Sequence, residues 1–495
     1  MPGPSDPRFL KGSTSMFRPL LLVVSLVALP VHAQDPDPEV GQALYGQVCA
    51  QCHGVRLQGG KAQSLVNGIW QFGARDGYIK RNIRNGITHL GMPAFGGVLT
   101  EHQIESIVSF LRAREQQAGI EPRPIPPRLQ SQDYQNIEVS IIAEGLEIPW
   151  SIDFLDDDTV LITERGGHLR VVEDGNLLAE PIAGVPEVVV RSQGGLLDVA
   201  IDPNHHDEGW IYLAYSHGLS ETAPDEDRPG AMTRIVRGKL RDHAWVDEQV
   251  LFEAPHETYL TTRHHYGCRI VFDPKGDLYF SIGDRGRRPH AQDLTRPNGK
   301  IHRIHRDGSI PDDNPFLDVE GALPSIYSYG HRNPQGLAIH PETGRLWITE
   351  HGPMGGDELN LVTPGLNYGW PEISYGIHYN GEIITDLETL PGMEQPNWIW
   401  KPSIAVCGLD FVKGDLFTQW KNHLLVGALK YEEVQLLTIH EDRVLHFETI
   451  LKNTGRVRDV QTGPDGAVYV VLNEPGTILR LAPAKPPTSI DELAF

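Results

Sequence analysis

Residues 269–283 read RIVFDPKGDLYFSIG, two apolar runs joined by an Asp-Pro-Lys-Gly turn. Such a run–turn–run segment predicts a β-hairpin. The same pattern occurs five more times, at 151–155 with 160–164, 196–201 with 210–215, 336–339 with 346–350, 408–412 with 424–429, and 458–462 with 467–472. Copies that recur about every 58 residues suit four-stranded blades, so residues 137–484 are predicted to form a six-bladed β-propeller. A β-sandwich is the alternative, but it would not be expected to keep one hairpin signature six times.

The composition excludes several classes of protein. The chain has 495 residues, of which 40% are hydrophobic and 22% charged, which is typical neither of a disordered chain nor of a multi-span membrane protein. The net charge of −22 argues against binding to nucleic acid or anionic lipid through bulk charge.

The N-terminus predicts export. Basic residues Arg8, Lys11 and Arg18 precede an apolar run at 20–29 and a small-residue cleavage site at 31–33, so residues 1–33 are interpreted as a signal peptide, with Met16 as an alternative start. A membrane anchor is the competing interpretation, but a run of about ten residues is too short to span a bilayer. We therefore expect a periplasmic protein with no transmembrane anchor after removal of the signal.

A haem site is predicted just after this segment. Cys49-Ala50-Gln51-Cys52-His53 is the C-x-x-C-H motif that attaches c-type haem, with His53 as one ligand of the iron. Met92 is the only methionine between Met16 and Met232 and is the expected second ligand. His89 is a competing ligand, a core role for Met92 is possible, and the two cysteines could instead serve zinc binding or redox chemistry.

Residues 39–118 resemble a class I cytochrome c domain, a small all-α unit that precedes the propeller. The next segment contains Pro122, Pro124, Pro126 and Pro127 and has no apolar period, so residues 119–136 are expected to be a semi-rigid linker.

The repeat places the functional residues. In every antiparallel hairpin the start of the first strand lies beside the end of the second, so these positions form one ring at one mouth of the propeller if the first strands line its axis. Asp284 is expected on this ring, at the end of a second strand. The ring also includes four cations, Arg332, Lys430, Arg456 and Arg458, in a strongly acidic protein. This arrangement predicts a small polyanionic ligand. The alternative is that each cation pairs with a local acid.

Seven strings around this ring resemble the soluble PQQ-dependent aldose sugar dehydrogenases of the glucose/sorbosone dehydrogenase family. The resemblance covers about residues 140–482. The strings are QGGLL at 193–197, HYGCR at 265–269, GHRNPQG at 330–336, GP at 352–353 with DE at 357–358, NYGWP at 367–371, GALK at 427–430 and RVRD at 456–459.

The resemblance implies a role for each site residue. His265 would be the general base that removes the C1 hydroxyl proton while hydride leaves for the quinone, beside His264, whose contribution stays open. The residues implied to contact PQQ are Gln193, Arg332, Asn333, Tyr379, Lys430, Arg456 and Arg458, with Arg332 also at the reactive carbonyl. The carbonyls of Gly352 and Pro353 would hold a Ca²⁺ that grips PQQ, and Glu358 with the Tyr368 carbonyl would hold a second Ca²⁺.

The combined hypothesis is a periplasmic quinohaemoprotein that oxidises aldoses to lactones and passes electrons from PQQ to haem c and then to an external acceptor. Two alternatives remain: the same chemistry on a non-sugar aldehyde or alcohol such as sorbosone, or a non-catalytic propeller joined to an electron-transfer cytochrome. Cys268 and Cys407 are expected to be buried free thiols, with a disulfide as the alternative.

Overall fold

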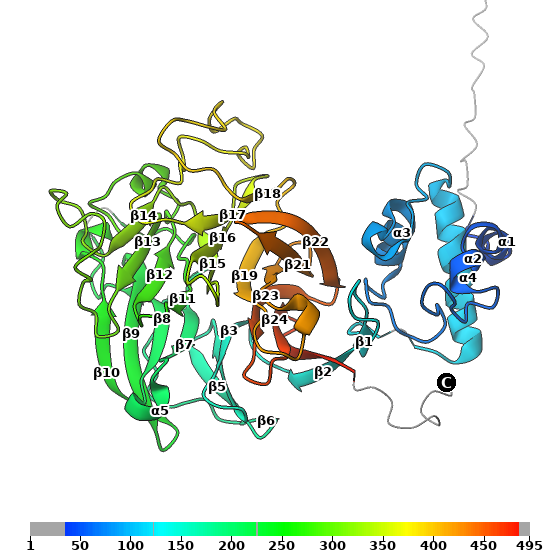
Figure 1. Ribbon diagram of the computed structural model, residues 1–495, viewed down its shortest axis with the longest axis horizontal. Helices are drawn as coiled ribbons and strands as arrows, with labels where there is room; N and C mark the ends of the chain where they lie inside the picture. The colour runs from blue at the N-terminus through cyan, green and yellow to red at the C-terminus, as the bar shows by residue number, and fades with distance from the viewer. Residues whose placement is uncertain (1–34, 122, 224–225, 485–495) are drawn as a thin grey trace, which may run out of the picture.

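The computed structural model describes residues 35–121, 123–223 and 226–484, which form a small helical domain beside a large β domain (Figure 1). The predicted signal peptide at 1–33 lies outside the described residues. Within the described part of the chain, no helix is long and apolar enough to cross a membrane.

The helical domain contains α1 (Pro38–Val48), α2 (Ala50–His53), α3 (Asp76–Asn85), the short η1 (Thr88–Leu90) and α4 (Glu101–Ala118). Local sequence explains the helix ends: Asp37 caps α1, and Thr100 with Gln103 forms a capping box at the start of α4. The apolar faces of the helices pack into one core that includes Tyr45, Ile79, Ile83, Ile104, Ile107 and Leu111.

The β domain is the predicted six-bladed propeller. Five blades are four-stranded antiparallel sheets in sequential order. They comprise β3 (Pro149–Phe154), β4 (Thr159–Glu164), β5 (His168–Glu173) and β6 (Asn176–Leu177); β7 (Leu196–Ile201), β8 (Ile211–Gly218), β9 (Ala231–Arg241) and β10 (Ala244–Phe252); β11 (Ile270–Phe272), β12 (Leu278–Ile282), β13 (Lys300–Ile304) and β14 (Ile326–Tyr329); β15 (Pro334–Ile339), β16 (Leu346–Glu350), β17 (Asp357–Val362) and β18 (Trp398–Trp400); and β19 (Val406–Phe411), β20 (Leu424–Ala428), β21 (Glu433–His440) and β22 (Arg443–Lys452).

The sixth blade closes the ring. It joins β23 (Arg456–Thr462), β24 (Val468–Glu474) and β25 (Thr477–Pro483) to β2 (Ile137–Ala143) from the opposite end of the propeller domain. Pairing of β2 with β25 therefore joins the two ends of the propeller domain within one blade. The first strand of each blade is an inner edge strand, and successive first strands adjoin around the axis.

The segment expected to be a linker, 119–136, is in part a piece of the propeller. Its residues 128–129 form β1 (Arg128–Leu129), which pairs with β2, and the Leu129 side chain is buried in the core of the sixth blade. Ile125 and Tyr134 pack against the same core. Burial of these three apolar side chains holds part of the segment against the sixth blade. The segment was expected to be a linker because it is too short to display an apolar period.

Candidate active site

The predicted ring exists at one mouth of the propeller. In the strand registers, Pro149 lies opposite Glu164, Pro334 opposite Glu350, and Arg456 opposite Glu474, so starts of first strands do face ends of second strands. The inner position of the first strands brings these ends around the axis.

His265 lies on the segment that leads into β11. Its backbone is left-handed, with φ of 54°, a conformation that a non-glycine residue adopts only when its surroundings hold it there. The His265 amide donates a 2.7 Å hydrogen bond to Gln193 Oε1, which supports this conformation from the neighbouring blade. The imidazole thus has a defined position at the mouth, with 15% of its side chain exposed.

A buried carboxylate orients this histidine. His265 Nδ1 lies 2.6 Å from Asp284 Oδ1, and the Asp284 side chain is 1% exposed. Asp284 also accepts hydrogen bonds from the Gly286 amide (2.7 Å) and from Trp370 Nε1 (2.8 Å). Because an ionised carboxylate only accepts, Nδ1 carries the hydrogen and Nε2 of neutral His265 keeps a lone pair. The pair therefore has the chemistry of a general base with its orienting acid.

Burial and nearby charges favour neutral His265 and ionised Asp284, which are the forms that a general base and its orienting acid need. Burial lowers the pKa of His265 below its ordinary value and the charge of Arg332 acts in the same direction, while Asp284 opposes both. Burial alone would raise the pKa of Asp284, but the hydrogen bond and charge of His265 and the charge of Arg332 hold it below its ordinary value. At neutral pH the dyad is a neutral imidazole beside a carboxylate.

Arg332 and Asn333 lie next to this dyad but in different environments. The Arg332 guanidinium donates to the His351 carbonyl (2.8 Å) and lies 5.4 Å from the centre of the Trp370 ring. Asn333 is 1% exposed, and its Oδ1 accepts from the Gly267 amide at 3.3 Å. Asn333 therefore helps to hold the backbone at Gly267, two residues after His265.

The four cations of the ring have no acidic partner in the part of the chain that the structure describes. Among the described residues, no carboxylate oxygen lies within 4.0 Å of the side-chain nitrogens of Arg332, Lys430, Arg456 or Arg458. Arg458 Nη1 donates to Gln335 Oε1 (2.9 Å) and to Cys407 Sγ (3.3 Å), and its buried Nε has no described partner. Burial lowers the pKa of Arg458. In a chain of net charge −22, such unpaired cations leave room for an anionic ligand.

His351 adds an unpartnered nitrogen to the ring. Its Nε2 is buried without a hydrogen-bond partner among the described residues. Burial, together with the charges of Arg458 and Arg332, lowers the pKa of His351 to about 3, so the imidazole is neutral.

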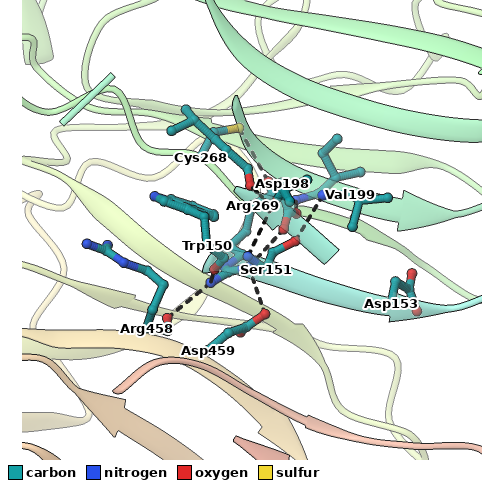
Figure 2. A network of polar contacts seen from close by, with 12 residues as sticks. Trp150, Ser151, Asp153, Asp198, Val199, Cys268, Arg269, Arg458 and Asp459 are labelled. Atoms are coloured by element: carbon teal, nitrogen blue, oxygen red, sulfur yellow. Dashed lines mark hydrogen bonds and ion pairs between the residues drawn. The ribbon is translucent and has the colours of Figure 1, made fainter. Parts of the chain in front are cut away.

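Beneath the ring, Arg269 of the third blade contacts residues of four other blades. Figure 2 shows its contacts with Asp198, Asp459 and Arg458. Its Nη1 bonds Asp198 Oδ1 (2.8 Å) and Asp459 Oδ2 (2.9 Å), and the guanidinium lies 4.3 Å from the centre of the Trp150 ring. Its other nitrogens donate to the carbonyls of Trp150, Arg458 and Gln335. This buried network fixes the backbone of Arg458, one of the ring cations.

The residues expected to bind calcium surround one small cavity. A space of about 20 Å³ is lined by Gly352, Pro353, Glu358 and Tyr368, together with Glu350 and Arg332. Burial and the neighbouring Glu350 raise the pKa of Glu358 to about 8. The described residues contain no group of three or more His, Cys, Asp or Glu side chains arranged to hold a metal, so any cation here would depend on carbonyl oxygens as well.

Two expected ligand contacts lie at the periphery. Gln193 is exposed and uses its Oε1 to hold the His265 amide. Tyr379 is 75% exposed, on the loop where Ile377 pairs with Met354. Cys268 and Cys407 are free and fully buried.

Two of the haem-site residues, Cys49 and Met92, pack against the core of the helical domain. Cys49 and Cys52 are free thiols on either side of the α2 start, and His53 Nδ1 lies 2.9 Å from the Gln63 carbonyl. This contact directs the proton to Nδ1 and leaves Nε2 for a metal. Cys49 and Met92 both pack against the same apolar cluster. The side chain of His89 lies outside the described part of the structure.

Comparison with known proteins identifies both domains. Residues 146–480 match the family model described as "Glucose / Sorbosone dehydrogenase". The chain belongs to the glucose/sorbosone dehydrogenase family. Residues 36–111 of this glucose/sorbosone dehydrogenase match a second model, subunit III of the cbb3-type cytochrome c oxidase, so a cytochrome c domain precedes the dehydrogenase domain.

Relatives of the dehydrogenase domain agree with this assignment. Aldose sugar dehydrogenase YliI of Escherichia coli is 42% identical over 354 residues, which are 70% of this chain and 93% of that protein. The apo-form crystal structure of the Escherichia coli soluble aldose sugar dehydrogenase has a TM-score of 0.65, with 40% identity over 70% of this chain and 100% of that one. The PQQ-bound aldose sugar dehydrogenase of Streptomyces coelicolor gives a TM-score of 0.55, with 26% identity over 70% and 98% of the two chains.

Three side chains of this glucose/sorbosone dehydrogenase gained their roles only from the structure. Asp284 was expected on the ring but not as the partner of His265. Trp370 was quoted only within a matching string, and neither it nor His351 had an expected role. Asp284 is 19 residues from His265 and Trp370 is 86 residues from Asp284, so no local spacing links them. The placement of Asp284 at the end of a second strand was the one available signal.

Proposed function

We propose that this protein is a periplasmic PQQ-dependent dehydrogenase that oxidises the C1 hydroxyl of aldose sugars to lactones and passes the electrons through its own haem c to an external acceptor. The observation that carries the proposal is that the oriented His265–Asp284 pair shares the mouth with four cations that have no acidic partner among the described residues. A tricarboxylate quinone matches both the positive charge and the need for a hydride acceptor.

The ring cations have two separate roles in this proposal, which are binding of the PQQ carboxylates and polarisation of the reacting carbonyl. Arg458, Arg456 and Lys430 bind the carboxylates of PQQ, and the buried unpartnered Nε of Arg458 offers a free donor for one of them. Arg332 lies close to the Trp370 ring and acts electrostatically on His265, so its charge can polarise the reacting carbonyl. When bound, PQQ supplies the two-electron acceptor for the hydride of the sugar.

His265 removes the proton of the sugar hydroxyl through Nε2. Asp284 holds the Nδ1 hydrogen and stabilises the imidazolium that forms, as a buried carboxylate does for a catalytic histidine. The proton then leaves to solvent, to which the His265 side chain is 15% exposed.

Calcium binding is part of the same proposal. The carbonyls of Gly352 and Pro353 would hold one Ca²⁺ beside PQQ, and Glu358 with the Tyr368 carbonyl would hold a second. The donor set fits a hard cation: Glu350 and Glu358 border the small cavity together, and the nearby Asn360 Oδ1 is buried without a described partner. Tyr379 and Gln193 would complete the pocket from its rim.

At the haem, Cys49 and Cys52 would form the two thioether bonds, and His53 and Met92 would ligate the iron. The contact of His53 Nδ1 with the Gln63 carbonyl supports this, because it leaves Nε2 free for iron.

The test loads the haem-containing protein with PQQ and Ca²⁺ and measures reduction of an artificial dye with a panel of aldoses, alditols and simple aldehydes. We expect dye reduction with aldoses that requires PQQ and is lost in His265→Ala. Turnover restricted to non-sugar aldehydes or alcohols would contradict the aldose substrate. Absence of PQQ binding by calorimetry would contradict the enzyme and favour a non-catalytic module.

A further inference from the structure

The cytochrome domain contacts the propeller at two loops of the mouth. The first loop joins β20 to β21 and contains Lys430 and Glu432. The second loop joins β22 to β23 and contains Asn453. Tyr78 of α3 donates to Glu432 in the first loop (3.2 Å), and Asn453 in the second donates to the Phe72 carbonyl (2.6 Å). In Figure 1 the helical domain lies beside this side of the propeller, with α3 facing it.

A buried glutamine holds the two domains together. Gln71 is 3% exposed, and its Nε2 donates to the carbonyls of Gln130 (2.7 Å) and Ile450 (3.2 Å). Its Oε1 accepts from the Gln130 amide at 2.9 Å. A buried side-chain amide with both its ends satisfied across an interface specifies one geometry, because any other would leave polar groups unpaired.

Both loops lead directly to residues of the ring. Lys430 lies in the first loop, and Arg456 begins β23 three residues after Asn453. An interdomain cavity of about 560 Å³ separates the domains at this point. Its propeller wall includes Lys430, Glu432, Lys452 and Asn453, and its cytochrome wall includes Phe72, Tyr78, Arg81, Asn82, Ile87 and Thr88.

The cytochrome wall of the cavity includes Ile87, which is paired with Met92, the proposed iron ligand. Ile87 pairs with Met92 through two backbone hydrogen bonds, Ile87 N to Met92 O (2.9 Å) and Met92 N to Ile87 O (3.1 Å). The cavity thus has a residue expected to bind PQQ on one wall and the loop of the expected iron ligand on the other.

We propose that this contact is a fixed internal electron-transfer junction, in which the Gln71 contacts hold the Met92 loop against the Lys430 edge of the ring. The inference rests on the proposed function and specifies where electrons cross. Oxidation of one aldose to its lactone releases two electrons and two protons. The protons go to solvent, and each electron reduces one ferric haem to ferrous, the second after an external one-electron oxidant has reoxidised the haem.

The test uses the full-length protein loaded with haem, PQQ and Ca²⁺. Gln71→Leu with Asn453→Ala removes the interdomain hydrogen bonds of Gln71 and of Asn453. Gln117→Leu is the matched control, because Gln117 is exposed and its side chain bonds Arg114 within α4. Amide hydrogen exchange of residues 128–134 reports docking, since the Gln130 amide donates to Gln71. Stopped-flow mixing with glucose follows haem reduction, and a dye assay follows sugar oxidation alone.

We expect the double variant to show faster exchange at residues 128–134. Haem reduction should be slower by about tenfold or more, because undocking lowers the effective concentration of the haem at the mouth of the propeller. Dye reduction should be unchanged, and the control should match the wild type in all three assays. Unchanged exchange in the double variant would overturn the docking contacts, and faster exchange with unchanged haem reduction would overturn the junction. Loss of dye reduction in the wild type would instead contradict the proposed function.

Discussion

Replacement of Asp284 by Asn is the sharpest perturbation of the proposed base. Asp284 accepts three hydrogen bonds, from His265 Nδ1, the Gly286 amide and Trp370 Nε1. An asparagine has one acceptor oxygen and one donor group, so it cannot satisfy all three. If its oxygen faces His265 and Gly286, the Trp370 N–H loses its partner; if it faces Trp370, the amide NH₂ faces His265 Nδ1 and moves the ring hydrogen to Nε2.

The second orientation removes the lone pair that takes the substrate proton, and the first leaves a buried donor unpaired. Loss of a correctly oriented general base lowers the rate by about 10²–10⁴-fold, which is about 2.7–5.4 kcal/mol of transition-state stabilisation. We therefore expect kcat/KM of Asp284→Asn to fall within this range.

The pH dependence supplies a second readout with a defined sign. Neutral His265 is the active form, so kcat/KM should be constant at high pH and fall as the pH drops through the lowered pKa of His265. Asp284 raises that pKa against burial and Arg332. Its neutralisation should lower the pKa further, so the acid limb should move to lower pH while the plateau drops.

The assay is a pH profile of kcat/KM with the dye acceptor and saturating PQQ and Ca²⁺, for the wild type, Asp284→Asn and the control Asp312→Asn. Asp312 is exposed and lies in the same third blade, so the control should match the wild type. Thermal unfolding of each variant checks folding. An Asp284→Asn variant with wild-type kcat/KM and an unmoved acid limb would refute the role of this pair.

Three further substitutions test the axial network, the cationic ring and the haem iron in turn. Arg269→Met should lower the free energy of unfolding by about 3–5 kcal/mol in urea, because it leaves Asp198 and Asp459 buried without their cation, and an unchanged midpoint would contradict the axial network. Lys430→Ala should weaken PQQ binding by about tenfold or more in calorimetric titrations, since a charged hydrogen bond contributes about 1.5–3 kcal/mol; equal affinity would remove Lys430 from the site. Met92→Ala should lower the haem reduction potential in a redox titration, whereas an unchanged potential would favour another ligand.

The fold was predictable to a large extent because the propeller repeats a local pattern. The hairpin quoted at 269–283 is observed as β11 and β12, and the other five hairpins occur within a few residues of their expected bounds. Strand β2 was not assigned to the sixth blade, because its pairing with β25 joins residues more than 300 positions apart. Strand β1 was missed because two residues show no alternation, and only its contact with β2 reveals it.

The site was predictable as a ring of positions but not as a set of contacts. Strand ends placed His265, Arg332, Lys430, Arg456 and Arg458 at the mouth, since antiparallel geometry alone decides which ends share an edge. The roles of Asp284, Trp370 and His351 depend on how three blades approach one another. That approach is set by packing between sheets, which no local sequence pattern encodes.

Internal electron transfer is decided by the haem spectrum of the full-length protein during stepwise addition of PQQ, Ca²⁺ and an aldose. We predict that the reduced haem band appears only when both PQQ and sugar are present, at a rate independent of protein concentration, and that it is lost in His265→Ala. A haem that stays ferric with PQQ bound, while sugar reduces an added dye, would contradict internal electron transfer. Reduction by sugar without PQQ would contradict the proposed chemistry itself.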